Sequence, residues 1–325
     1  MTYSVGGLIQ AADFNTFRTT INDFWSTGIT DNGWGQTAIS AVAAGGVVTA
    51  TNWATVVNNL ATAGAQTTTT LTARTAPVTG NVIAILSNVG ADISSVSARR
   101  GYATFLGAQS NTWTGSISKT TATGSGRTAW TITWTQTVTF PSANQARYFW
   151  NAGGAVSLVM GKSSTGTDID ADWNTFVGTV GTLAMTGRVN NASQTIGGGV
   201  YTGFTRAGGS GTPSPNLTTT GWYTLTAGAA ATTMFQLNST VYPYTADFIR
   251  VTAAKDATST ILTLVTTWSQ SVQYQNTNIS GGTATSSGSS SITGTAPTVL
   301  CQVYPPATNY LTNTWGTPVV ASSVA

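Results

Sequence analysis

Side chains that can ionise are rare in this chain, and their scarcity restricts both its fold and its chemistry. Charged residues make up 6% of the 325 positions, whereas an average soluble protein has about 25%. All nine acidic residues are Asp, and the sequence contains neither Glu nor His. Eleven Trp, ten Tyr and ten Phe still give it many large side chains to bury, which a disordered chain lacks. We therefore expect a folded protein with nearly uncharged surfaces. Such surfaces favour association, since interface centres exclude charge; a monomer with a neutral surface is the alternative.

The residue types present also exclude several kinds of site. Without His there is no Ser-His-Asp or Cys-His arrangement, and without Glu a glycosidase would need two Asp. Cys301 is the sole cysteine, which excludes a disulfide within the chain and a Cys/His zinc site. The net charge of +3 includes no basic cluster larger than Arg99-Arg100, so we expect no nucleic-acid binding. We predict no catalytic, cofactor-binding or metal-binding residues.

The first residues and the apolar runs bear on where the protein acts. The N-terminal stretch lacks the basic start and apolar run of a secretion signal. No apolar run approaches the roughly 20 residues of a membrane-spanning helix. We expect a protein made in the cytoplasm that leaves, if at all, by a route such as particle assembly and lysis.

Residues 1–101 are predicted to form a mainly helical module. Apolar residues recur at helical spacing over 8–25, 51–64 and 80–99. Thr51 is the predicted N-cap of the second helix. Arg99-Arg100 and Gly101 are typical of the C-terminal end of the third helix.

Short patterns recur along the chain. Residues 9–14 resemble residues 48–53, and Asp13-Phe14-Asn15-Thr16-Phe17 matches Asp172-Trp173-Asn174-Thr175-Phe176. Each pattern predicts a short capped helix anchored by an aromatic side chain. Duplication and a shared capping solution explain the repeats equally well.

After Gly101 the periodicity changes from helical to alternating. Apolar residues from Trp130 to Phe140 alternate with Thr, which predicts a strand with one apolar and one hydroxyl face. Further strands are expected over 155–160, 182–185, 222–226, 247–253, 260–268 and 299–304, with a helix over 171–180. Residues 247–253 and 260–268 form a predicted hairpin. The Gly/Ser/Thr-rich stretch 276–296 is either a flexible loop or a polar strand pair.

These patterns predict an α+β fold, with a small helical N-terminal module followed by β-sandwich or jelly-roll-like domains. The helical docking or oligomerisation module covers 1–101. A β-rich domain with a short helix near 171–180 covers 102–212, and a C-terminal sandwich-like domain covers 213–325.

The acidic cluster Asp168, Asp170 and Asp172 is the one place that suggests an ion. Its spacing begins like a calcium loop, but Trp173 and Thr179 occupy the positions where an EF-hand needs Gly and an acid. The acids also precede a predicted helix, whose N-terminus favours negative charge. We favour this capping role over an irregular calcium site. Cys301 and the tryptophans are expected in the core, rather than as a nucleophile or as platforms for sugar rings.

The segment Phe140-Pro-Ser-Ala-Asn-Gln-Ala-Arg-Tyr-Phe-Trp-Asn-Ala-Gly-Gly154 resembles a family of virion structural proteins of cyanophages and other tailed phages, often called tail-fibre-like. The 9–17 pattern, the helix ending at Arg99-Arg100 and the stretch 310–316 are similar to that family too. Read physically, 140–154 predicts a strand end and a tight Gly153-Gly154 turn, with Arg147 stacked on a neighbouring aromatic ring.

The resemblance implies a non-enzymatic virion component, such as a fibre, collar or tail appendage, that is assembled in the host cytoplasm. Its expected partners are other copies of itself, with a trimer favoured, and other virion proteins. The alternative is a receptor- or glycan-binding adhesion protein that contacts a host surface glycan. A polysaccharide depolymerase built on Asp168, Asp170 and Asp172 is disfavoured by the missing His and Glu.

Overall fold

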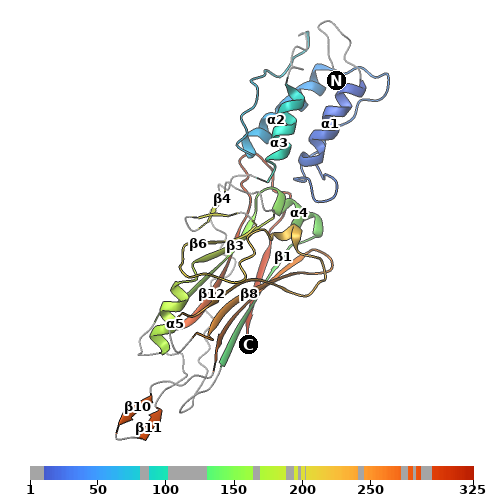
Figure 1. Ribbon diagram of the computed structural model, residues 1–325. Coiled ribbons are helices and arrows are strands. Elements are labelled where there is room, and N and C mark those ends of the chain that lie inside the picture. The colour runs from blue at the N-terminus through green and yellow to red at the C-terminus, as the bar shows by residue number, and fades with distance from the viewer. Residues whose placement is uncertain are drawn as a thin grey trace. The chain divides into compact units, whose positions relative to one another are not determined.

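The computed structural model in Figure 1 describes residues 11–80, 88–101, 130–163, 169–187, 194–196, 199–201, 203–240, 245–271, 277–280, 283–286 and 295–325. The chain divides into two compact units. The helical unit comprises Met1–Ala108, Pro141–Gly154 and Pro305–Gly316, and the β unit comprises Gln109–Phe140, Ala155–Tyr304 and Thr317–Ala325. The α+β class and the helical N-terminal part are as the sequence predicts.

Three helices of the helical unit lie where apolar spacing places them: α1 (Ala11–Trp25), α2 (Ala50–Gln66) and α3 (Val89–Ala98). Phe14 and Phe17 of α1 both contact the fully buried Trp53 of α2 edge-on, with ring centroids 5.6 and 5.9 Å apart. The predicted aromatic anchors of the repeated pattern are therefore core residues. Residues 81–87 of the third predicted helix lie outside the described residues.

The ends of these helices are set by local hydrogen bonds. The N-cap of α2 is Thr49 rather than the predicted Thr51, because Thr49 and Asn52 bond reciprocally in a capping box. Arg100 follows α3 and donates from Nη1 to the carbonyl of Ser97 at 2.9 Å, as expected for a cation at a helix C-terminus.

An extended segment after α1 is fastened to that helix by side-chain amides. Asn22 accepts from the main-chain N–H of Ile39 and donates to its carbonyl, both at 2.9 Å. Asn15 makes the same pair of bonds with Val42, at 3.0 and 2.7 Å. Each amide imitates a strand partner, so a segment without regular secondary structure still has paired main-chain groups.

Residues 140–154 do not continue the predicted strand, although they do turn at Gly153, where φ is +104°, into the strand that begins at Ala155, as predicted. They contain helix α4 (Ala143–Asn151), for which Ser142 is the N-cap and accepts from the N–H of Gln145 at 3.2 Å. A Ser followed three residues later by Gln is a helix-start signal. The strand prediction was wrong because it followed the preceding alternation past Pro141. Arg147 does lie over the Tyr148 ring, 5.3 Å from its centroid.

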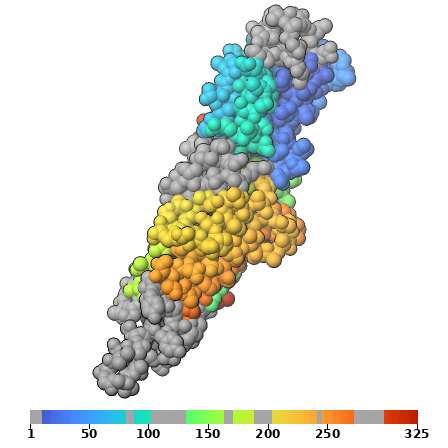
Figure 2. All heavy atoms as spheres, in the orientation of Figure 1, coloured from blue at the N-terminus to red at the C-terminus, as the bar shows by residue number. Residues whose placement is uncertain are grey.

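The first sheet of the β unit has five antiparallel strands in the order β13-β1-β9-β8-β7. They are β1 (Trp130–Thr139), β7 (Thr232–Asn238), β8 (Phe248–Lys255), β9 (Ile261–Gln270) and β13 (Val319–Val324). The alternation in β1 is confirmed, since Ile132, Trp134 and Val138 are fully buried. The predicted hairpin is the β8–β9 pair. On the face shown in Figure 2, the yellow and orange stretch that includes β7, β8 and β9 forms much of the surface of the β unit.

The second sheet has four antiparallel strands in the order β12-β2-β3-β6. They are β2 (Ala155–Ser163), β3 (Thr182–Thr186), β6 (Phe204–Ala207) and β12 (Thr295–Tyr304). Helix α5 (Ile169–Gly178) links β2 to β3 and packs against β2. The described part of the unit also contains two short hairpins: β4 (Gln194–Ile196) with β5 (Gly199–Tyr201), and β10 (Thr277–Ser280) with β11 (Thr283–Ser286). The second hairpin is the polar strand pair that was one of two predictions for 276–296.

Two predictions about the β half were wrong. The expected β domains 102–212 and 213–325 are one unit, because β1 pairs with β9 and β2 pairs with β12 across that boundary. Residues 222–226 form no strand; Trp222–Thr224 is a 3-10 turn whose Trp222 packs on Phe140. Alternation identifies a strand but not the distant strand with which it pairs.

Uncharged polar side chains interrupt the apolar face of the five-stranded sheet. Gln136 is fully buried on β1, and Ser322 lies opposite it on β13. Within the described ranges, no hydrogen-bond partner is found for the two amide atoms of Gln136, the hydroxyl of Ser322 or that of the buried Thr266. Such groups are rare in folded proteins.

Candidate interaction surfaces

The aromatic side chains are used mainly in the core. Trp173 of α5 stacks on Trp268 of β9, with ring centroids 5.7 Å apart. The ring centroid of Trp134, on the neighbouring strand β1, lies 4.9 Å from that of Trp268. The largest fully buried side chains are mostly Trp: Trp34, Trp53, Trp134, Trp150, Trp173, Trp268 and Trp315. The prediction that the tryptophans are core residues is confirmed for these seven.

Cys301 is fully buried on β12, and burial raises the pKa of its thiol to about 12. A thiol reacts as the thiolate, which this environment disfavours. The prediction of a small buried residue is confirmed.

The acidic cluster is described in part. Asp168 and the side chain of Asp170 lie outside the described residues, whereas Asp172 lies in the first half of α5. Asp172 borders a shallow hollow with Trp173, Phe176, Ser239 and Asp247. Among the residues described, no three acidic or Cys side chains gather as a metal site would require. The choice between helix capping and calcium binding therefore stays a prediction.

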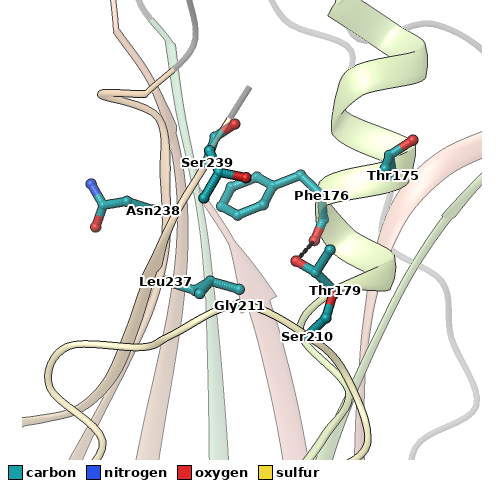
Figure 3. A pocket seen from close by; sticks show the side chains of 9 residues that line it. Thr175, Phe176, Thr179, Ser210, Gly211, Leu237, Asn238 and Ser239 are labelled. Carbon is teal, nitrogen blue, oxygen red and sulfur yellow. Dashed lines mark hydrogen bonds between the residues drawn. The ribbon is translucent and has the colours of Figure 1, made fainter. Parts of the chain in front are cut away.

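A small neutral pocket of about 100 Å³ lies between α5 and β7 (Figure 3). Phe176 and Leu237 supply its apolar wall. The remaining lining residues carry hydroxyl or amide groups or are Gly: Thr175, Thr179, Ser210, Gly211, Asn238, Ser239 and Thr240. Hydroxyl and amide groups beside a ring could hold an uncharged hydroxylated ligand.

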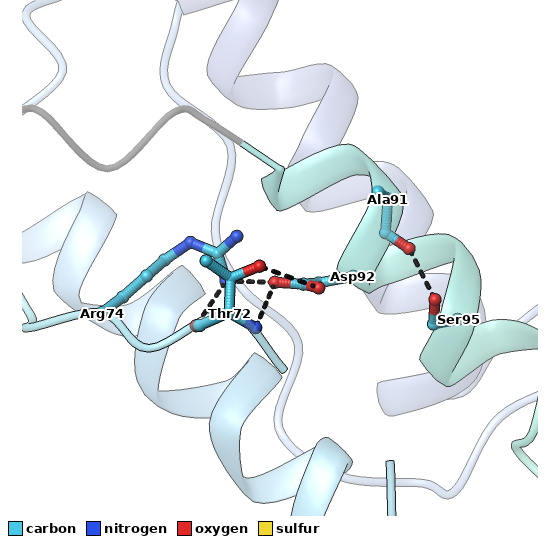
Figure 4. A network of polar contacts seen from close by, with 5 residues as sticks. All are labelled: Thr72, Arg74, Ala91, Asp92 and Ser95. Atoms are coloured by element: carbon cyan, nitrogen blue, oxygen red, sulfur yellow. Dashed lines mark hydrogen bonds and ion pairs between the residues drawn. The ribbon is translucent and has the colours of Figure 1, made fainter. Parts of the chain in front are cut away.

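The helical unit contains an ion pair between Arg74 and Asp92 (Figure 4). Arg74 pairs with Asp92 of α3, and their side chains are 7% and 10% exposed. Asp92 also accepts from the main-chain N–H of Thr72 at 3.1 Å. A hollow of about 310 Å³ beside Arg74 is lined mainly by apolar side chains, including Val57, Leu60 and Leu71. The ion pair joins the segment after α2 to α3, which is a structural role.

Three of the four outer strands of the two sheets carry a feature that hinders pairing with another strand. Segment 214–217 bonds to β7 and contains Pro215. Strand β12 contains Pro297 and a register shift between Thr295 and Thr298. Strand β6 is four residues long and includes Arg206. Short length, charge, Pro and bulges are the usual protections of sheet edges.

Strand β13 is the fourth outer strand, and it has none of these features. Its sequence from Val319 to Val324 contains no charge and no Pro, and its pairing with β1 runs without a register shift. Val319 is 62% exposed. This strand was not predicted from the sequence, although Val-Val-Ala-Ser-Ser-Val has the β-branched residues of a strand.

Comparison with known proteins identifies no relative: no family model matches the chain, and no curated protein or solved structure is significantly similar to it. None of the described helices is long and apolar enough to cross a membrane.

Proposed function

We propose that this chain is a non-enzymatic structural component of a tailed-phage particle, a fibre, collar or tail appendage that acts by self-association and by docking on other virion proteins. The single observation that supports this most is the use of its scarce reactive side chains to hold the fold. Cys301 is sealed in the core, and Asp92 pairs with Arg74. Asp247 accepts two bonds from Ser271, and Asp256 binds the hairpin that contains it.

The resemblance over Phe140–Gly154 supplies the phage context of the proposal. In the structure this segment is α4, whose Asn151 donates to the carbonyls of Asp31 and Gly33 at 2.8 and 3.0 Å. Trp34 in turn donates to the carbonyl of Asn151 at 3.0 Å. The residues that carry the resemblance therefore help build the helical unit, which is the unit proposed to dock on the particle.

Purified particles provide the test. Antibodies raised against the recombinant chain should label particles in electron micrographs, and its peptides should sediment with particles through a density gradient. A chain that stays with the unassembled proteins of the lysate would contradict the proposal.

The pocket between α5 and β7 favours a second candidate, binding of a neutral surface glycan. A glycan array would test it with Thr175→Ala and Asn238→Ala, which remove polar groups from the rim of the pocket. Thr232→Ala, at the exposed start of the same strand, is the matched control. Binding that is lost in the rim variants and kept in the control would support the glycan function, and an array without hits would dismiss it.

A further inference from the structure

The main-chain groups on the outer edge of β13 have no partner in the part of the chain that the structure describes. Ala325 and Thr133 exchange both main-chain hydrogen bonds at 2.9 Å. Because bonded pairs alternate along antiparallel strands, Ser323, Ala321 and Val319 also turn their N–H and C=O groups toward β1. The groups of Val320, Ser322 and Val324 therefore point away from β1, and no described residue bonds to them.

We propose that β13 pairs antiparallel with β13 of a second copy of this chain, about a two-fold axis at Ser322. This register sets Ser322 opposite its counterpart and Val320 opposite the Val324 of the other copy. All three residues with outward main-chain groups then face one another, which gives about six new hydrogen bonds, two for each bonded pair. The five-stranded sheets of the two copies would become one continuous sheet.

The side chains of β13 suit this self-pairing. On one face Val320 meets Val324, and on the other Ala321 meets Ser323, so neither like charges nor bulky groups come together. The hydroxyl of Ser322 is buried and has no partner among the described residues. In the proposed pairing the Ser322 residues of the two copies stand opposite each other, and a rotation about χ1 that turns both hydroxyls toward the partner strand would let them bond to each other.

The protections on the other edges restrict the assembly to a pair. A ring of three copies would need β13 to bind a different edge of its neighbour. The other three outer strands carry a covering segment, a Pro with a bulge, or a charge on a short strand. A two-fold pair uses the unprotected edge twice. This contact gives a dimer rather than the trimer favoured from the sequence.

The proposal rests on the self-association proposed above, and a charge-exchange experiment separates the two. Ala321→Lys with Ser323→Lys places like charges directly opposite each other in the proposed register, and so does Ala321→Asp with Ser323→Asp. Each double variant of the full chain should have half the wild-type mass in size-exclusion chromatography with light scattering. Mixing the two should restore the wild-type mass, because opposite charges then meet. Restoration also shows that the variants are folded.

Crosslinking tests the register. Cα atoms of a bonded pair lie about 5.5 Å apart, which suits a disulfide. Ser322→Cys should therefore form a covalent dimer on oxidation, and Ser323→Cys, which faces Ala321 instead, should form far less. A wild-type chain that is monomeric at high concentration would overturn both this pairing and the proposed self-association. The β13 pairing alone would be overturned if the charge variants had the same oligomeric mass as the wild type and Ser322→Cys formed no covalent dimer.

Discussion

Gln36 and Thr312, 276 positions apart in the chain, are joined in the helical unit by three hydrogen bonds. The amide of Gln36 donates to the carbonyl of Thr312 at 3.0 Å and accepts from its N–H at 3.0 Å and from its hydroxyl at 2.7 Å. Asn15 and Asn22 bind Val42 and Ile39 in the same way. A side-chain amide that imitates a strand partner is thus a repeated device of this unit, and it attaches the 305–316 segment to the residues after α1.

Replacing Gln36 should loosen that attachment. Gln36→Ala leaves main-chain groups of Thr312 unpaired, which should cost about 2–3 kcal/mol of the free energy of unfolding. Chemical denaturation would measure the loss, and limited proteolysis should show earlier cleavage within 305–316. Gln36→Glu keeps the acceptor but loses the donor, so it should also destabilise near neutral pH. If the Gln36→Glu variant is as stable as the wild type, the hydrogen bond that Gln36 donates to Thr312 contributes little to stability.

The Arg74–Asp92 pair should show strong coupling. Arg74→Met leaves a carboxylate enclosed without its cation, and removing one partner of a buried pair typically costs about 3–5 kcal/mol. The double variant Arg74→Met with Asp92→Asn should cost clearly less than the sum of the two single changes. Equilibrium unfolding of the four proteins gives the coupling energy. Additive effects would mean that the pair contributes little despite its burial.

Asp256 should stabilise the β8–β9 hairpin in a pH-dependent way. Burial raises its pKa, but bonds from Thr258, Thr260 and Ile261 outweigh this and lower the pKa to about 2. Because the unfolded pKa is about 3.9, the stabilisation is complete above roughly pH 4 and is lost as the pH falls through about 2. Asp256→Asn should therefore cost about 1 kcal/mol at pH 7, a modest figure because the site is solvent-screened. The difference from wild type should disappear near pH 2, and a constant difference across that window would contradict the assignment.

Cys301 should be unreactive while the β unit is folded. Its pKa of about 12 keeps the thiol neutral at pH 8, and burial blocks access. Labelling with a thiol reagent should follow global unfolding, whereas Ser323→Cys on the exposed face of β13 should add one site that labels at once. The raised pKa also means that stability falls as the pH rises above about 8.5, where the unfolded thiol begins to ionise. Cys301→Ala should weaken this alkaline loss.

The amino-acid sequence alone determined the local elements of this protein. Helical spacing located α1, α2 and α3, and the Trp130–Phe140 alternation located β1, because an amphipathic pattern belongs to one segment and is read from neighbouring residues. The scarcity of proton-transferring side chains is likewise a property of the sequence itself, which contains neither His nor Glu. Even α4 had a local signal in Ser142 and Gln145, although a competing strand pattern obscured it.

The tertiary structure alone decided which distant segments belong together. The residues around Gln36 do not predict its contact with Thr312. No local pattern predicts that β13 pairs with β1 or that β2 pairs with β12. Hydrogen bonds between strands link main-chain groups that every residue carries, so pairing is selected by the packing of the whole core rather than by a code in either strand. The position of β13 at the edge of its sheet, with no further neighbour among the described residues, is a consequence of that selection.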